Sequence, residues 1–379
     1  MMKNILIVDD SALMRSVLRD IISSDDRFSC KDYARNGEDA LGLLERHEYD
    51  AIVLDINMPK MNGLEFLQEL SQRGRKEKVI VASSDTADGT DITIRALELG
   101  AFDFIQKPKN TVDSKGCTFR NRLLEMLALA TDSEPRSAQN RKVKIDKEFV
   151  NTISEMVSSI KASQPEIPPG TVQDVHGTGG KRRTDKGRVL VALACSTGGP
   201  KALQQVIPYL PKNLDAPVLI VQHMPVGFTK SLAERLDQIS EISVKEAEEG
   251  DILKKGVVYI AKGGMHMKYK DTPTGGRIYY SDEPPREGVK PAANYMYESL
   301  MDCEYYDTIL CVVLTGMGMD GTKGILNLSE KKKIHIIAQD AATCTVYGMP
   351  KAIAATGKVN QVVALQNVAQ EITMNVGVN

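Results

Sequence analysis

The stretch ILCVVLTGMGMDG, residues 309–321, is the strongest indication of how this chain folds. Its first six residues are all apolar, which is typical of a strand buried on both faces of a parallel sheet. Three glycines follow, and they allow a sharp turn before residues 322–328, which can form a helix. Asp320 therefore comes at the carboxyl end of a strand, where open α/β sheets bind ligands.

Two junctions of the same kind lie upstream. An apolar run at residues 189–194 leads into Ser196, and another at residues 218–221 leads into His223. Between residues 244 and 280 the strands become shorter, and they are expected at residues 257–260, 266–269 and 277–280. Residues 188–379 are thus predicted to form a doubly wound, mostly parallel α/β domain with a small antiparallel insertion.

Residues 3–130 alternate between strand and helix five times. Strands are expected at residues 5–8, 30–34, 51–54, 79–82 and 102–105, and helices at residues 11–23, 37–46, 63–72, 91–99 and 118–129. Five such units predict a flavodoxin-like α/β domain, whose parallel sheet has the order 2-1-3-4-5. Residues 131–187 are rich in proline and glycine and are interpreted as a linker, with helical periodicity at 147–161 and a solvated basic cluster at 181–183.

Composition excludes several classes of protein. The 379 residues suffice for two domains, and a net charge of −2 without a basic stripe argues against a nucleic-acid partner. The chain starts with a strand-like segment that reaches acids within ten residues, and no apolar run is long enough to cross a bilayer. Six scattered cysteines form no CxxC pair. We therefore expect a cytoplasmic protein with reduced thiols and no membrane insertion.

Acidic residues gather at one edge of the first predicted sheet. Asp9 and Asp10 end its first strand, and Asp55 ends its third, which is the neighbouring strand in the expected order. Taken alone, Asp9 and Asp10 could merely cap the first helix. Three converging carboxylates, however, require a cation, and oxygen ligands suit Mg²⁺. Lys107, before a proline, ends the fifth strand, and Ser83 or Ser84 ends the fourth, so a transferred phosphoryl group would find a cation and a hydroxyl opposite Asp55.

A serine nucleophile is the second candidate. Ser196 opens a helix through Gly-Gly-Pro, near backbone N–H groups that could hold an anion. Its hydroxyl needs a base, and His223 is the one histidine of five in a strand-end loop of the right kind. Asp320 could orient that ring. The residues alone leave two interpretations open, because such a serine or aspartate often only caps a helix and Ala194 replaces the first glycine of a Gly-x-Ser-x-Gly elbow.

Residues 3–130 resemble the receiver domain of two-component response regulators. The resemblance rests on LDINMP at residues 54–59 followed by Asn-Gly, and on the acids, serine and Lys-Pro at the strand ends. It implies that Asp55 accepts a phosphoryl group and that Ser83 and Lys107 bind it. It also implies that Mg²⁺ is bound by Asp9, Asp10, Asp55 and the carbonyl of Asn57. Phe104 matches the aromatic switch position.

Residues 188–370 resemble the chemotaxis protein-glutamate methylesterase family. The motifs are STGGP at 196–200, QHMP at 222–225 with GFT at 227–229, TGMGMDG at 315–321, and AQD at 338–340 with YGMP at 347–350. A receiver ahead of this domain is that family's architecture. The resemblance implies a triad of Ser196, His223 and Asp320, an oxyanion contact from the Met317 backbone N–H, and no cofactor in the catalytic domain.

The implied activity is hydrolysis of γ-glutamyl methyl esters on chemoreceptors, with deamidation of receptor glutamines as a second reaction. The chemotaxis histidine kinase would phosphorylate Asp55, which would weaken the packing of the receiver over the catalytic face. One departure is the segment 290–294, Lys-Pro-Ala-Ala-Asn, where the family has an Arg-Pro-Ser-Val-Asp-like stretch. A rival from another class is a signalling module whose second domain only binds a partner, and a serine-reactive probe would separate the two because such a module should not be labelled at Ser196.

Overall fold

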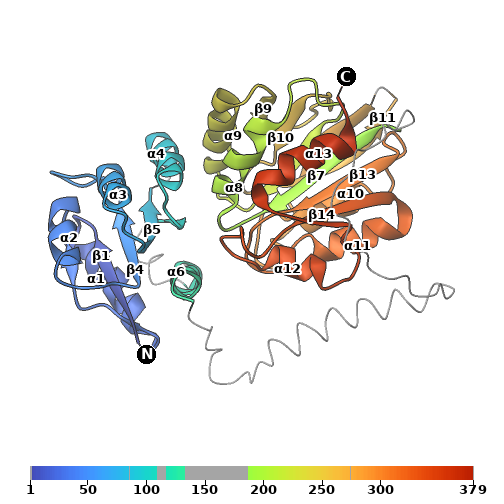
Figure 1. Ribbon diagram of the computed structural model, residues 1–379. Coiled ribbons are helices and arrows are strands. Elements are labelled where there is room, and N and C mark those ends of the chain that lie inside the picture. The colour runs from blue at the N-terminus through green and yellow to red at the C-terminus, as the bar shows by residue number, and fades with distance from the viewer. Residues whose placement is uncertain (1, 85, 109–116, 133–186, 274, 379) are drawn as a thin grey trace.

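The computed structural model of this protein describes residues 2–84, 86–108, 117–132, 187–273 and 275–378. It contains two parallel sheets, each covered by helices on both faces, and one separate hairpin (Figure 1). The helix expected at residues 147–161 and the basic cluster at 181–183 lie outside the described residues. Within them, no helix combines the length and the apolar character needed to cross a membrane.

The first sheet confirms the predicted order, since its strands run β2-β1-β4-β5-β6. The strands are β1 (Lys3–Val8), β2 (Phe28–Ser29), β3 (Tyr33–Ala34), β4 (Ala51–Asp55), β5 (Lys78–Ser83) and β6 (Asp103–Gln106). The second predicted strand, expected as one piece at 30–34, is divided into β2 and β3, which both pair with β1. Lys3 pairs with Phe28 but Ile7 pairs with Tyr33, so one extra residue interrupts the strand.

Helices cover both faces of this sheet. One face carries α1 (Ala12–Ser23) and α6 (Cys117–Ala130), and the other carries α2 (Gly37–Leu44), α3 (Gly63–Gln72) and α4 (Ala87–Glu98). Helix α4 begins earlier than the expected residue 91, because the Thr86 side chain accepts a hydrogen bond from the Gly89 N–H and caps it. A capping box at Asn62 and Glu65 likewise sets the start of α3.

The second sheet has seven strands in the order β15-β14-β13-β7-β8-β10-β9, and all pairs are parallel. Its strands are β7 (Val189–Cys195), β8 (Val218–Gln222), β9 (Ser243–Glu246), β10 (Val257–Ile260), β13 (Thr308–Val313), β14 (Lys333–Gln339) and β15 (Gln361–Val363). Among the described residues, the antiparallel insertion consists of β11 (His266–Thr272) and β12 (Gly275–Ser281). The short strand expected at residues 257–260 forms β10, which belongs to the parallel sheet and lies between β8 and β9.

Two apolar layers enclose this sheet. In β7 the side chains of Val191 and Leu193 belong to one layer, and those of Leu190 and Ala192 belong to the other. The first layer is completed by α8 (Gly199–Val206), α9 (Phe228–Ile239) and α13 (Val368–Val376), with the short helices η1 (Ile207–Tyr209) and η2 (Leu365–Asn367). The second is completed by α10 (Ala293–Ser299), α11 (Thr322–Lys331) and α12 (Met349–Ala354).

The two parts of the molecule touch along α4, α8 and α9. At the centre of this interface, the ring of Phe104 stacks on that of Phe228 with 4.6 Å between centroids. In the same interface, Arg235 binds Glu98 at 2.5 Å, and the buried hydroxyls of Thr90 and Ser231 lie 2.8 Å apart. The interface therefore combines an aromatic contact with polar pairs, and strand-end residues of both sheets line one cavity beside it.

Candidate functional site

The predicted acid cluster forms at the end of the first sheet. Ligand oxygens of Asp9, Asp10 and Asp55 all lie within 4.8 Å of one another. The Lys107 ammonium group lies 2.8 Å from Asp9 Oδ2 and 2.9 Å from Asp55 Oδ1. Burial raises the pKa of Asp55, although Lys107 opposes this shift. Three carboxylates with one exposed member fit a small hard cation such as Mg²⁺, which prefers oxygen ligands and retains water.

The side chains of the other residues predicted for this cluster, Ser83 and Asn57, point to other surroundings than the three acids. The Ser83 hydroxyl donates toward the Gly89 carbonyl at 3.2 Å and accepts from the Thr93 hydroxyl at 2.5 Å, so it is bonded to α4. Among the described residues it has no hydrogen bond to Asp55. Asn57 lies just after β4 with its side chain exposed. Lys107 alone of the predicted phosphate-binding groups thus contacts the acids in this arrangement.

Ser196 lies in the turn between β7 and α8. Its N–H donates to the Thr315 carbonyl at 3.0 Å, and its own carbonyl accepts from the Gly199 N–H at 2.7 Å. Gly198 takes a φ of 75°, which opens the helix tightly. A Cβ at Gly316 would come within 2.8 Å of Ser196 Cβ, so a glycine is required where the two loops meet. The nucleophile predicted from sequence is thereby held at the edge of the sheet and is nearly buried.

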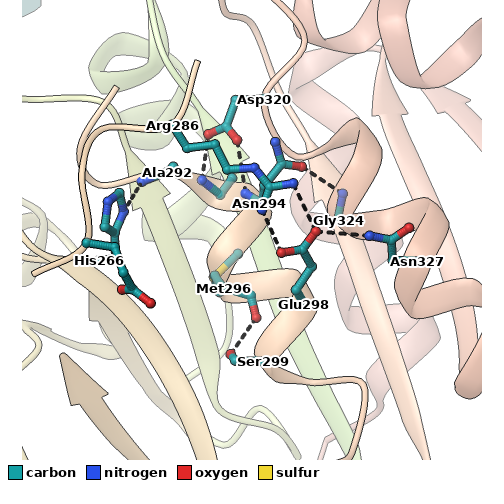
Figure 2. A network of polar contacts seen from close by, with 12 residues as sticks. His266, Arg286, Ala292, Asn294, Met296, Glu298, Ser299, Asp320, Gly324 and Asn327 are labelled. Atoms are coloured by element: carbon teal, nitrogen blue, oxygen red, sulfur yellow. Dashed lines mark hydrogen bonds and ion pairs between the residues drawn. The ribbon is translucent and has the colours of Figure 1, made fainter. Parts of the chain in front are cut away.

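His223 and Asp320 meet as predicted. His223 Nε2 lies 2.8 Å from Asp320 Oδ2, although the two residues come from different strand ends. The carboxylate also accepts the N–H groups of Ala293 at 2.5 Å, Asn294 at 3.0 Å and Gly321 at 2.9 Å (Figure 2). Burial alone would raise the pKa of Asp320, but these hydrogen bonds, with that to His223 foremost, lower it below its ordinary value. Asp320 therefore stays ionised and holds the ring.

The remaining ring nitrogen of His223, Nδ1, is left for the serine. Ser196 and His223 line one cavity of about 430 Å³, whose opposite wall comes from β6 and α6 of the first part of the chain. Asp103, Lys107 and Arg122 belong to that wall. Within the part of the chain that the structure describes, Ser196 Oγ makes no hydrogen bond to His223. The structure thus brings the three predicted residues to one site with the Asp–His pair already joined.

Gln222 is a site residue that the sequence reasoning missed. It is fully buried, and its amide group donates to the carbonyls of Ser196 at 3.0 Å and His223 at 3.2 Å. Its amide oxygen accepts from the Cys195 thiol at 3.0 Å. It also fills the space at Gly199, where a Cβ would lie 1.9 Å from Gln222 Oε1. The available signal was a polar residue at the end of an otherwise apolar strand.

Met317 lies in a tightly held loop. The Gly316 carbonyl accepts the N–H groups of Gly348 at 3.1 Å and Met349 at 2.8 Å. A Cβ at Gly348 would lie 3.0 Å from the Gly318 nitrogen, so this loop approaches the neighbouring one closely. Within the described residues the Met317 N–H has no hydrogen-bond partner. A free donor in a fixed loop is what an oxyanion contact requires.

His266, in contrast, serves the fold. It is fully buried, its Nδ1 accepts the Ala292 N–H at 3.1 Å, and its Nε2 donates to the Pro284 carbonyl at 3.2 Å. Burial lowers the pKa of His266, which keeps this ring neutral. It thereby fixes the chain just before α10.

Comparison with known proteins places both parts of the chain. Residues 191–372 match the family described as CheB methylesterase, and residues 5–114 match the response regulator receiver domain. A protein-glutamate methylesterase/protein-glutamine glutaminase of Syntrophomonas wolfei is 40% identical over 374 residues, 98% of either chain. That of Bacillus subtilis is 36% identical over 372 residues, again 98% of either chain.

A crystal structure of the Thermotoga maritima CheB methylesterase catalytic domain is 39% identical, covers 50% of this chain and 99% of that one, and has a TM-score of 0.47. The full-length relatives carry the assignment, because their similarity extends over both sheets and the segment between them. The chain therefore belongs to the protein-glutamate methylesterase/protein-glutamine glutaminase family and combines a response regulator receiver domain with a CheB methylesterase domain.

Proposed function

We propose that this protein hydrolyses glutamate methyl esters on chemoreceptors with Ser196 as the nucleophile, under control of phosphorylation at Asp55. The observation that carries the proposal is the 2.8 Å contact between His223 and Asp320 in the cavity that Ser196 also lines. Residues 188–379 are proposed as the catalytic domain, residues 3–130 as the receiver and residues 131–187 as the linker. Chemoreceptors are the proposed substrate, and we place the protein in the cytoplasm with their signalling helices.

The reaction follows from the ring geometry. With His223 Nε2–H donating a hydrogen bond to Asp320, His223 Nδ1 accepts the proton of Ser196 while the serine oxygen attacks the ester carbonyl carbon. The Met317 N–H donates to the resulting oxyanion. Protonated His223 then returns the proton to the departing methoxide, and methanol leaves. A water molecule, activated by His223, attacks the acyl-serine and releases glutamate. A glutamine side chain would follow the same path with ammonia as the leaving group.

The receiver reaction rests on the acid cluster. Asp9, Asp10 and Asp55, with the carbonyl of Asn57, are the proposed Mg²⁺ ligands, and the cation supplies positive charge against the incoming phosphoryl group. Asp55 accepts that group from the chemotaxis histidine kinase. Lys107, which already binds Asp55 at 2.9 Å, is proposed to move onto the phosphoryl oxygens. The Ser83 hydroxyl would have to leave its α4 partners to join it.

Lys107 also suggests how the two sites communicate. It contacts the acid cluster and at the same time lines the cavity that contains Ser196 and His223. Phe104, three residues earlier, stacks on Phe228 of the catalytic domain. In this arrangement the receiver restricts access to the serine. Phosphorylation at Asp55 would change the ion pairs of Lys107 and the stacking of Phe104 on Phe228. The population would then shift toward an open arrangement of the two domains.

The test is methanol release from a methylated receptor by wild-type protein and by Ser196→Ala, each with and without a small phosphodonor. Loss of the nucleophile should lower the rate by several orders of magnitude, while phosphorylation of the receiver persists. A serine-reactive probe provides the matched control, because a module that only binds a partner would not be labelled at Ser196. Near-normal methanol release by the alanine variant would mean that Ser196 is only a helix cap.

A further inference from the structure

Helices α10 and α11 begin side by side, and Asn294 lies where they meet (Figure 2). The side chain of Asn294 is completely buried, and its amide oxygen accepts the N–H groups of Gly324 at 2.7 Å and Gly321 at 3.1 Å. Helix α11 has glycine at its N-cap and no capping side chain of its own. Asn294 therefore satisfies the first N–H groups of α11 from the neighbouring helix.

The glycines of α11 make this contact close. A Cβ at Gly324 would lie 2.8 Å from the Asn294 carbonyl oxygen and 2.9 Å from its Cα. Gly321 has a φ of 91°, a conformation that other residues rarely adopt. The two helix starts can therefore approach only at these positions, which leaves room for one small polar side chain between them.

The same junction holds the catalytic aspartate. Asp320 Oδ1 accepts the N–H groups of Asn294 and Gly321, and the Gly321 N–H is shared between Asp320 Oδ1 and Asn294 Oδ1. Residue 294 thus contacts Asp320 through its backbone and, by way of Gly321, through its side chain. Any shift of Asn294 is passed to Asp320 and from there to His223, which is bonded to the same carboxylate.

The other end of the Asn294 amide faces a second acid. Asn294 Nδ2 donates to Glu287 Oε1 at 2.9 Å. Glu287 is an exposed residue, but burial of its carboxyl group and the nearby Asp320 raise its pKa. An amide accepts from α11 and donates to Glu287 at the same time, whereas an ionised carboxylate of the same size could only accept. Asn294 therefore bonds to both Glu287 and Asp320 without adding a third negative charge.

We propose that Asn294 is a positioning residue for the Asp320–His223 pair and that, together with Glu287, it sets the negative charge that the pair experiences. This inference rests on the proposed triad. Arg286, on the loop before α10, is a charged neighbour of Glu287. From the receiver, Asp103, Lys107 and Arg122 line the wall of the cavity that faces His223. The substitutions below leave those groups unchanged.

The test compares three variants of the full chain: Asn294→Asp, Glu287→Gln and the swap Asn294→Asp/Glu287→Gln. Asn294→Asp adds a negative charge, which faces the Glu287 carboxylate. Because a negative charge stabilises a protonated imidazole, the acid limb of the plot of kcat/KM against pH should move to a pH about 0.5 to 1 unit higher. The swap restores both the net charge and an amide-to-carboxylate hydrogen bond, and the limb should return to its wild-type position. Glu287→Gln alone should move the limb down.

Asn327→Asp is the matched control. Asn327 Nδ2 donates to Glu298 Oε1 at 2.9 Å along the same pair of helices, so the control loses an equivalent bond away from Asp320 (Figure 2). Its pH profile should stay unchanged. For Asn294→Asp, a rate profile and a His223 ring titration that both stay unshifted would overturn the proposal, as would no return in the swap or an equal shift in the control. Should Asn294→Asp fail to fold, Glu287→Gln and the swap decide the same question.

A second measurement separates this proposal from the proposed function. Nuclear magnetic resonance of the His223 ring follows its protonation directly and needs no turnover. A shift of the ring titration and of the rate profile together supports the positioning role. A shift of the ring titration without the rate profile would leave the role of Asn294 intact and remove His223 from the catalytic assignment. No shift in either would overturn the positioning role and leave the triad untouched.

Discussion

The acid cluster of the receiver and the Asp320 carboxylate of the catalytic domain both lie at the carboxyl end of a parallel sheet, but different groups hold them. Lys107, a single cation, lies between Asp9 and Asp55. Asp320 is held instead by three backbone N–H groups and one imidazole. The pKa values of the two carboxyl groups shift in opposite directions: that of Asp55 is raised and that of Asp320 is lowered.

This difference fits the two chemical tasks. A carboxylate paired with one lysine can exchange that partner for a metal ion or accept a phosphoryl group, since only one side chain has to move. A carboxylate that accepts several fixed N–H groups keeps its charge and its place through every turnover. We infer that the receiver site is arranged to change state and that the catalytic site is arranged to stay constant.

The largest expected effect comes from a change at Asp320 in the catalytic site. The Asp320 carboxylate has two oxygens that accept hydrogen bonds, whereas the amide of Asp320→Asn has one. The variant therefore leaves His223 without its orienting partner, and buried N–H groups lose an acceptor. Turnover should fall by about 10⁴. The free energy of unfolding should fall by about 1 to 3 kcal/mol, because buried donors are left unsatisfied. Methanol release and thermal unfolding measure the two effects, and wild-type turnover in this variant would exclude Asp320 from the triad.

The second prediction concerns Asp55 in the acid cluster of the receiver. In Asp55→Asn an amide replaces the carboxylate, and an amide cannot form an acyl phosphate. The ratio of methanol release with and without phosphodonor should fall to one, and removing Mg²⁺ from the wild-type protein should have the same effect. Exposed Asp26→Asn, in the turn before β2, is the control and should keep its stimulation. Stimulation that survives in Asp55→Asn would mean that another group is phosphorylated.

The smallest expected effect lies between the two sites. Phe104→Ala removes the ring that stacks on Phe228 at 4.6 Å, and such a pair contributes about 0.5 to 1.5 kcal/mol beyond its buried area. Without phosphodonor, methanol release should rise roughly 2- to 10-fold as the closed arrangement loses population. Tyr33→Ala, an exposed aromatic residue of the receiver, is the control. An unchanged or lower rate in Phe104→Ala would argue that the receiver does not restrain the catalytic domain through this contact.

Much of the fold was predictable because strand ends obey a simple rule. Apolar runs identified the strands of both sheets, and parallel strands bring their carboxyl ends to one edge, so the residues after each run had to meet there. Asp9, Asp10 and Asp55 come together for this reason. The sequence did not say which sheet residues 257–260 join, because a short apolar run has the same pattern in a hairpin and in a central strand.

The sequence by itself determined the two sheets, the family and the residue types at the strand ends, since these depend on local patterns and on motifs contiguous in the chain. Only the tertiary structure decided which groups hold those residues. Gln222 bonds to the serine and histidine loops, Asn294 joins α10 to α11, and Phe104 stacks on Phe228, a residue more than a hundred positions away. Such contacts depend on how separate elements approach, and no local pattern encodes that distance.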